Sequence, residues 1–223
     1  PFPVIAAPHS LALGGGYEIM GAADRIVASA ELYTGLVEVG VGLIPGAGGN
    51  LRMIMKTQDR YGKGRTGAFQ VAQKAFEAIG FAKISMSAKH AVSIGYLTKD
   101  DIIIVNGDHR VTRAKAEVLA MSEGYVAPAM RTDLFLPGKG GRLAVKSSVK
   151  GFLKSGKISE HDALIAEKLA FVLTGGDRGG IMKPLDEQYL LDIEREAFVS
   201  LGGEAKTRAR IEYMLKRGKP LRN

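Results

Sequence analysis

The feature of this sequence that most constrains its fold is a pair of glycine-rich turns within residues 11–49, each accompanied by a glutamate. The first turn reads LALGGGYE and carries Glu18, and the second reads LVEVGVGLIPGAGG and carries Glu38. Glycine allows a tight turn, and it lets another molecule approach the backbone without a Cβ in the way. Two carboxyl groups beside such turns indicate a site for acid–base chemistry.

The first turn lies between an apolar run and a helical pattern. Val4–Ala7 predict a strand, Gly14–Gly16 a turn and Tyr17–Ala23 a helix. A helix that begins at such a turn has unpaired N–H groups and the positive end of its dipole at the same place. The turn can therefore hold an oxyanion, and a thioester enolate is a charge of the kind that such a site stabilises.

Each glutamate also has a simpler explanation. Glu18 lies in the first turn of a helix, where the dipole alone favours an acid. Glu38 stands between two valines and is typical of a solvated residue at a strand edge. Pro45 and the glycines at 46–49 repeat the turn pattern and predict a second helix from about residue 47. Glycine spacing alone leaves these alternatives open.

The residues PVIAAPHSLALGGGYEIMGAADRIVASAELYTGLVEVGVGLIPGAGGNLR, positions 3–52, resemble the signature block of the crotonase (enoyl-CoA hydratase/isomerase) superfamily. The block includes both glycine turns and both acids. The closing segment LLDIEREAFVSLGGEAKTRARIEYMLKRGKPLRN, positions 190–223, resembles the helical tail of one subgroup. In that subgroup a hydratase module forms the C-terminal part of a bacterial 3-hydroxyacyl-CoA dehydrogenase fusion protein.

The resemblance implies a role for six residues. Gly15 matches the residue whose N–H forms half of the oxyanion hole, and Glu18 and Glu38 match the two acids that hold the reacting water. Gly46 matches a glycine that lines the acyl pocket. Residues expected to contact substrate are Leu13, Gly15, Val37 and Gly46. Hydratases of the family have both acids whereas the isomerases generally work with one, so the pair favours hydration over isomerisation.

The implied reaction is the addition of water to a trans-2-enoyl-CoA, which gives a 3-hydroxyacyl-CoA. The Gly15 N–H would polarise the thioester carbonyl, and water would attack C3 while a proton reaches C2. We expect Glu18 to act as the base and Glu38 as the acid. Two neighbouring carboxyls in an apolar pocket tend to share one proton, because like charges raise one of the two pKa values.

The implied fold is α/β, a crotonase-like spiral of ββα units that is N-terminally truncated and followed by an α-helical C-terminal region. We expect a partial core at residues 1–105 and the helical region at 106–223. Family members continue upstream with residues that supply the other oxyanion donor and much of the CoA pocket. This chain is therefore expected to be a fragment with weak activity or none, its alternative role being a non-catalytic oligomerisation module.

The expected partners follow from the same resemblance. They are the acyl-CoA substrate and either further copies of the chain, as trimers, or the missing dehydrogenase part. We expect no cofactor in this chain, since no GxGxxG opens a βαβ unit, and NAD only in the dehydrogenase part.

Composition excludes several classes of site. The chain has no cysteine, so disulfides, thiol nucleophiles and cysteine-ligated metals are excluded, and a cytoplasmic location is expected. Its four histidines are far apart and show no metal-ligand spacing. No apolar run reaches the length of about 18 residues that spans a membrane.

The net charge of +8 is unevenly distributed. Residues 1–50 carry −3 and the rest carries +11, with basic clusters at Lys63-Gly64-Arg65 and Lys216-Arg217-Gly218-Lys219. Solvated helix faces account for most of this charge, and attraction of CoA phosphates is a second interpretation. Nucleic-acid binding is disfavoured, because aromatic residues do not alternate with the basic ones.

Hydrophobic periodicity predicts further elements. Strands are expected at 25–28 and 102–105, and Ser87 is the predicted N-cap of a short helix. Glycine runs at 138–141 and 175–180 are expected to break the chain. Longer helices are expected at about 66–79, 110–122, 142–154, 159–173, 186–200 and 204–217.

Overall fold

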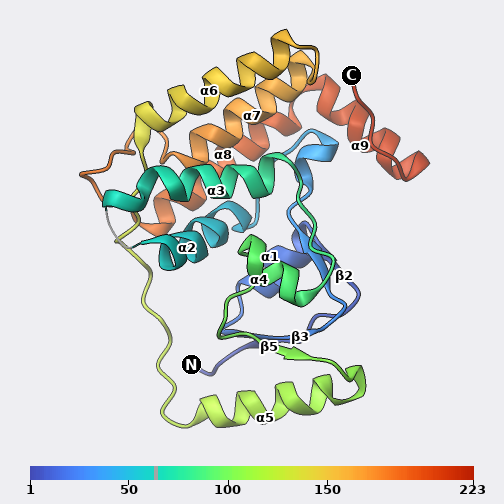
Figure 1. The fold of residues 1–223 in the computed structure, drawn as a ribbon, viewed down its shortest axis with the longest axis vertical. Coiled ribbons are helices and arrows are strands. Elements are labelled where there is room, and N and C mark those ends of the chain that lie inside the picture. Colours follow the sequence, from blue (N-terminus) through green and yellow to red (C-terminus); the bar gives the residue numbers. More distant parts are fainter. Residues whose placement is uncertain (63–64) are drawn as a thin grey trace. The chain divides into compact units, whose positions relative to one another are not determined.

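Short parallel strands and longer amphipathic helices make up the computed structural model, which describes residues 1–62 and 65–223 (Figure 1). Lys63 and Gly64 of one predicted basic cluster lie outside these residues. By their contacts the described residues form two units, Pro1–Leu36 with Ile84–Met130, and Val37–Lys83 with Arg131–Asn223. The division after residue 105 that the sequence suggested is a different one and stays a prediction.

The first unit is built from two small parallel sheets. One sheet has the order β1–β3–β5, formed by Ile5–Ala6, Arg25–Ser29 and Ile102–Ile104. The other pairs β2 (Leu11–Leu13) with β4 (Tyr33–Gly35). Strands in equivalent places of successive repeats thus pair in parallel, β1 with β3 and β2 with β4. Parallel neighbours require a crossover connection, and the chain therefore winds as a spiral of ββα units.

Helices accompany these strands in the first unit. α1 (Gly15–Gly21) packs on β2, α4 (Ala88–Ile94) on β4, and α5 (Arg110–Ser122) on β1 and β3. The Ser87 side chain accepts the His90 N–H, which confirms the predicted N-cap. The sequence patterns missed β2 and β4, because three residues are too few to show an alternation.

The second unit is helical. A 3-10 turn, η1 (Glu38–Val41), is followed by α2 (Gly49–Tyr61), the short turn η2 (Arg65–Gly67) and α3 (Ala68–Gly80). After residue 131 come α6 (Gly138–Lys154), α7 (Glu160–Leu173), α8 (Glu187–Gly202) and α9 (Ala205–Arg217). α7 packs between α6 and α8 and also contacts α3 (Figure 1). Its buried face, with Ile165, Leu169 and Leu173, forms the centre of this unit's core.

One predicted chain break is wrong. The glycine run at 138–141 was expected to separate elements, but α6 begins at Gly138. Gly138 has a φ of +64°, and a Cβ there would lie 2.2 Å from the Gly179 carbonyl oxygen. Glycine is therefore required at position 138 because the start of α6 lies in direct contact with the turn after α7. It does not mark the end of a helix. The run at 175–180 does separate α7 from α8, as predicted.

Candidate active site

The first glycine turn joins β2 to α1 and leaves one backbone donor open. Gly14 has a φ of +55°, and its N–H donates to the Gly35 carbonyl of β4 at 2.8 Å. Gly15 then begins α1, and its N–H makes no hydrogen bond within the described part of the chain. Gly15 is exposed, and a Cβ built on it would meet nothing within 4 Å. The exposed backbone of Gly15 and its lack of a Cβ agree with the predicted approach of a carbonyl group to this N–H.

Glu18 lies one turn further along α1. Its side chain is buried, with a relative exposure of 7%. A glutamate that served only the helix dipole would gain that interaction while remaining solvated. A buried carboxylate is held by partners or serves a function, and a role of Glu18 in chemistry stays a prediction.

The second acid begins η1. Glu38 is half-buried and is the first residue of that turn, rather than a residue at a strand edge. The turn is closed by the Gly42 N–H, which donates to the Val39 carbonyl at 3.2 Å, and by the Leu43 N–H, which donates to the Glu38 carbonyl at 3.1 Å. Val37, the other predicted contact here, is the half-buried residue before the turn.

Gly46 is confined by α8 rather than open. A Cβ at Gly46 would lie 2.4 Å from the Phe198 ring, a distance that no real contact allows. Phe198 therefore occupies the space where Gly46 lacks a side chain. If Gly46 lines an acyl pocket, as the resemblance implies, Phe198 forms part of the same wall.

The second glycine turn differs from the first, because its backbone donors are already used. Both oxygens of the Glu194 carboxylate accept hydrogen bonds, from the Gly48 N–H at 2.6 Å and from the Asn50 N–H at 2.9 Å. Glu194 lies on α8 with a relative exposure of 1%. The start of α2 thus holds the protein's own anion. Sequence analysis missed Glu194, since only its place on an amphipathic helix marked it.

The predicted residues are distributed over both units. Leu13, Gly15 and Glu18 come together in the first unit, where Leu13 ends β2 and the other two begin α1. Val37, Glu38 and Gly46 belong to the second unit, on η1 and on the loop before α2. The assignment of catalytic and substrate-binding roles to these six residues stays a prediction.

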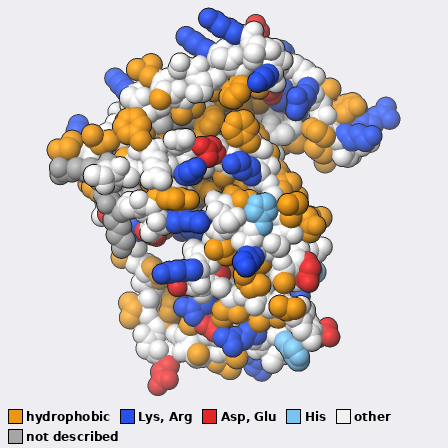
Figure 2. Space-filling view, viewed as in Figure 1, with side chains coloured by type: hydrophobic (Ala, Val, Ile, Leu, Met, Phe, Trp, Pro, Cys, Tyr) orange, Lys and Arg blue, Asp and Glu red, His pale blue; other side chains and the backbone are white. Residues whose placement is uncertain are grey.

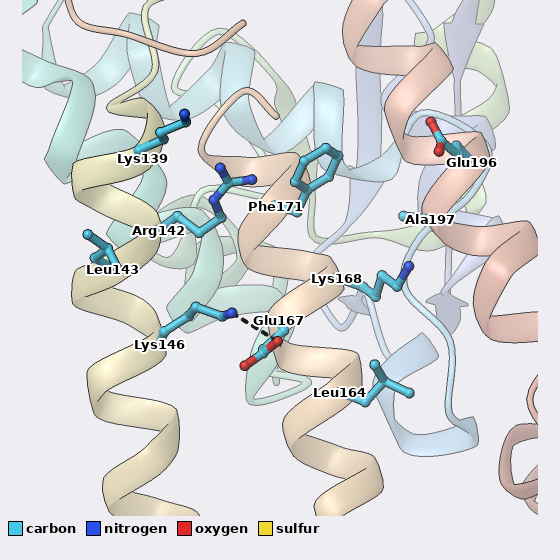
Figure 3. A pocket seen from close by; sticks show the side chains of 10 residues that line it. All are labelled: Lys139, Arg142, Leu143, Lys146, Leu164, Glu167, Lys168, Phe171, Glu196 and Ala197. Carbon is cyan, nitrogen blue, oxygen red and sulfur yellow. Dashed lines mark ion pairs between the residues drawn. The ribbon is translucent and has the colours of Figure 1, made fainter. Parts of the chain in front are cut away.

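A basic hollow of about 520 Å³ lies along α7 in the second unit (Figure 3). Lys146 pairs there with Glu167 at 3.1 Å, and Arg142 pairs with Asp177 at 3.3 Å. Across the face shown in Figure 2, Lys and Arg side chains are likewise mixed with acids and apolar groups. This mixture agrees with the interpretation of the positive charge as solvated helix faces. The hollow is lined by Lys139, Arg142, Leu143, Lys146, Leu164, Glu167, Lys168, Phe171, Glu196 and Ala197.

The residues that the structure describes lack two further features. Among them no helix combines the length and the apolar character that crossing a membrane requires. In the same residues, no three histidine or acidic side chains are grouped so that they could hold a metal ion.

Comparison with curated proteins gives one match along almost the whole chain. The chain is 45% identical over 221 residues to a Bacillus subtilis protein named "Probable 3-hydroxyacyl-CoA dehydrogenase". This match covers 99% of the chain but only 27% of the relative, so the chain spans about a quarter of that protein. No family model matches the chain.

Shorter matches cover about a quarter of the chain. The human enoyl-CoA hydratase domain-containing protein 2 is 49% identical over 53 residues, which are 24% of the chain and 18% of that protein. The fatty acid oxidation complex subunit alpha of Vibrio cholerae is 49% identical over 55 residues, 24% of the chain and 8% of that protein.

Solved structures identify the fold. A carnitinyl-CoA hydratase from Mycobacterium avium superposes with a TM-score of 0.55 at 20% identity, over 98% of this chain and 62% of that one. A carnitinyl-CoA dehydratase from Mycobacterium avium 104 also superposes with a TM-score of 0.55 at 20% identity, over 98% of this chain and 63% of that one. These structures confirm the predicted crotonase-like fold, in the part of that fold that the chain spans.

Proposed function

We propose that this chain is the enoyl-CoA hydratase module of a longer polypeptide that also carries a 3-hydroxyacyl-CoA dehydrogenase. The observation that carries the proposal is the open Gly15 N–H next to the buried Glu18, on a crotonase fold. Support for the longer polypeptide comes from the match over 99% of the chain to a relative named as a dehydrogenase. The hydratase would make the 3-hydroxyacyl-CoA that the dehydrogenase oxidises, as a step of fatty-acid β-oxidation.

In the proposed reaction the thioester carbonyl accepts a hydrogen bond from the Gly15 N–H. This bond draws electron density from C3 and stabilises the enolate that forms when water attacks there. Glu18 takes a proton from the attacking water, and Glu38 gives a proton to C2, so that the net change is addition of one water molecule. The step needs one ionised and one protonated carboxyl group, and no cofactor takes part in it. NAD would serve only the dehydrogenase part.

Two remaining features belong to the same proposal. Copies of the chain would associate as trimers, or the helices of the second unit would pack against the dehydrogenase part. We also place the protein in the cytoplasm, with which a chain without cysteine is consistent.

The test measures hydration of crotonyl-CoA and of longer enoyl-CoA substrates, by the loss of the conjugated enoyl absorbance, in the natural full-length protein. Glu18→Gln and Glu38→Gln should each lower kcat by about 10²- to 10⁴-fold, the usual contribution of a general acid or base. Glu160→Gln is the matched control, since Glu160 also lies in the first turn of a helix but far along the chain from either turn.

The alternatives predict different results. An isomerase would shift the double bond of a 3-enoyl-CoA and would depend strongly on only one of the two acids. A module without catalytic function would lose nothing in either glutamine variant. Activity of the full-length protein that is unaffected by both variants would contradict the proposal.

A further inference from the structure

Helix α9 contacts the turn that carries Glu38. The Thr207 hydroxyl donates a hydrogen bond to the Gly42 carbonyl at 2.8 Å, across 165 positions of the chain. Thr207 has a relative exposure of 0%, so no water competes for this bond. Gly42 directly follows η1 as its C-terminal cap, with a φ of +89°. The bond therefore holds the end of the turn whose first residue is Glu38.

Helix α9 lies so close to this turn that there is no room for a side chain at Gly42. A Cβ on Gly42 would lie 2.8 Å from the Thr207 hydroxyl oxygen and 3.0 Å from its Cα. Glycine is needed here twice, for the left-handed φ and for the contact. Because Thr207 and Gly42 are in direct contact, a change of the side chain at Thr207 alters the position of Gly42.

A buried histidine of α7 holds Thr207 in turn. His161 Nε2 lies 2.9 Å from the Thr207 hydroxyl oxygen, and His161 has a relative exposure of 4%. A hydroxyl has one hydrogen, which Thr207 gives to Gly42, so His161 Nε2 is the donor in this pair. Three segments are thereby linked in one buried chain of hydrogen bonds: α7, α9 and η1.

We propose that Thr207 is a positioning residue for Glu38, with His161 as its support. This inference rests on the proposed role of Glu38 as the acid. The hydrogen bonds from Gly42 and Leu43 back to Val39 and Glu38 tie the end of η1 to its beginning. A fixed Gly42 carbonyl thus fixes the direction from which the Glu38 side chain leaves the backbone. Small displacements of a catalytic group lower the rate strongly, whereas they affect binding of the substrate much less.

The test compares two buried threonines of the second unit in the natural full-length protein. Thr207→Val removes the hydroxyl and keeps the shape, and Thr207→Ser keeps the hydroxyl. Thr174→Val is the matched control, because Thr174 also has a relative exposure of 0% and its hydroxyl donates to the Ala170 carbonyl at 2.7 Å, at the C-terminal end of α7. We expect Thr207→Val to lower kcat for crotonyl-CoA roughly tenfold with KM within about twofold. Thr207→Ser and Thr174→Val should keep the wild-type kcat.

Amide hydrogen exchange supplies a readout that does not depend on catalysis. Exchange at the Gly42 and Leu43 amides should be faster in Thr207→Val than in Thr174→Val, because the turn loses its anchor. Equal exchange in both variants would overturn the inference. If Thr207→Val does not fold, two variants of His161 provide the test. His161→Gln keeps a hydrogen-bond donor to Thr207, and His161→Leu does not. Only the leucine variant should then lower kcat.

A double variant separates failure of this inference from failure of the proposed function. If Thr207 acts through Glu38, then Glu38→Gln with Thr207→Val should be no slower than Glu38→Gln alone. Additive losses, or a Thr207→Val enzyme with the kcat of Thr174→Val, would overturn the positioning role. Wild-type activity in Glu38→Gln itself would instead refute the proposed function, whatever Thr207 does.

Discussion

The two glycine-rich turns are alike in sequence but differ in what their backbone donors do. In the first, the Gly15 N–H makes no hydrogen bond within the part of the chain that the structure describes, and a Cβ on Gly15 would meet nothing within 4 Å. In the second, the Gly48 and Asn50 N–H groups bind the Glu194 carboxylate, and Gly46 is pressed against the Phe198 ring.

The difference shows how one local geometry serves two purposes. A helix that starts after glycine offers N–H groups and a positive dipole end, and it attracts whichever anion the fold places there. At α2 that anion is a side chain of the same unit, and the result is packing of α2 against α8. At α1 the Gly15 N–H makes no hydrogen bond within the described residues, and in the proposed function it binds the thioester carbonyl. Three predictions test this contrast, and a fourth concerns the pH dependence of the second unit.

The largest effect should follow from removing the open donor. Gly15→Pro deletes the N–H at the first position of α1, where proline is well tolerated because that N–H has no partner within the helix. We expect kcat of the full-length enzyme to fall about 10²- to 10³-fold, as when other oxyanion donors are removed, with little change in thermal stability. Gly15→Ala keeps the N–H and is the control. A folded proline variant with wild-type kcat would show that this N–H does not act on the substrate.

Removal of the Glu194 carboxylate should instead lower the free energy of unfolding. Glu194→Ala leaves two buried N–H groups without acceptors, and we expect the free energy of unfolding to fall by about 3 kcal/mol. Glu196→Ala, an exposed glutamate of the same helix, should change it little. Denaturant unfolding measures both. If Glu194→Ala left stability intact, the second turn would not depend on its own carboxylate, and the contrast between the turns would fail.

The same substitution should have opposite outcomes in the two turns. Gly46→Ala drives a methyl group into the Phe198 ring and should cost about 2 kcal/mol of stability. Gly15→Ala places its methyl group in open space and should cost little. Adding Phe198→Leu to Gly46→Ala should restore part of the loss. Equal stabilities for the two alanine variants would mean that Gly46 is not confined as the structure shows.

The smallest expected effect is a pH dependence of the free energy of unfolding, which arises from His161, the buried histidine that holds Thr207. Burial, and then the charge of Arg210, hold the pKa of His161 below its ordinary value of 6.5. Glu204 and Asp162 act in the opposite sense and Lys206 in the same sense. Below pH 6.5 the unfolded chain therefore binds more protons than the folded one, and the free energy of unfolding decreases as pH falls through 6.5.

The decrease should level off once the folded protein is protonated at His161 as well. Its size is about 1.4 kcal/mol for each unit by which the two pKa values differ. Urea unfolding between pH 5 and 8 measures it, and His161→Gln should lack this component. A pH dependence that is the same in wild type and His161→Gln would contradict the assignment.

Much of the fold could be predicted from the sequence because its signals are local. The long helices at 110–122 and 159–173, the Ser87 cap and the strands at 25–28 and 102–105 each follow from periodicity, capping or β-branched runs, and the structure confirms them. The short strands β2 and β4 could not be found in this way, nor could the start of α6 among glycines. Their existence depends on pairing with residues distant in the chain.

The sequence by itself determined where the glycine turns lie and that Glu18 follows the first turn, since backbone freedom and dipole preference are properties of neighbouring residues. It predicted the first helix from Tyr17, whereas α1 begins at Gly15. The tertiary structure decided which turn stays open. Glu194 meets Gly48 across 146 positions, and Thr207 meets Gly42 across 165. No local pattern encodes such contacts, because they arise only when packing of apolar helix faces brings distant polar groups together in a buried environment, where each must find a partner.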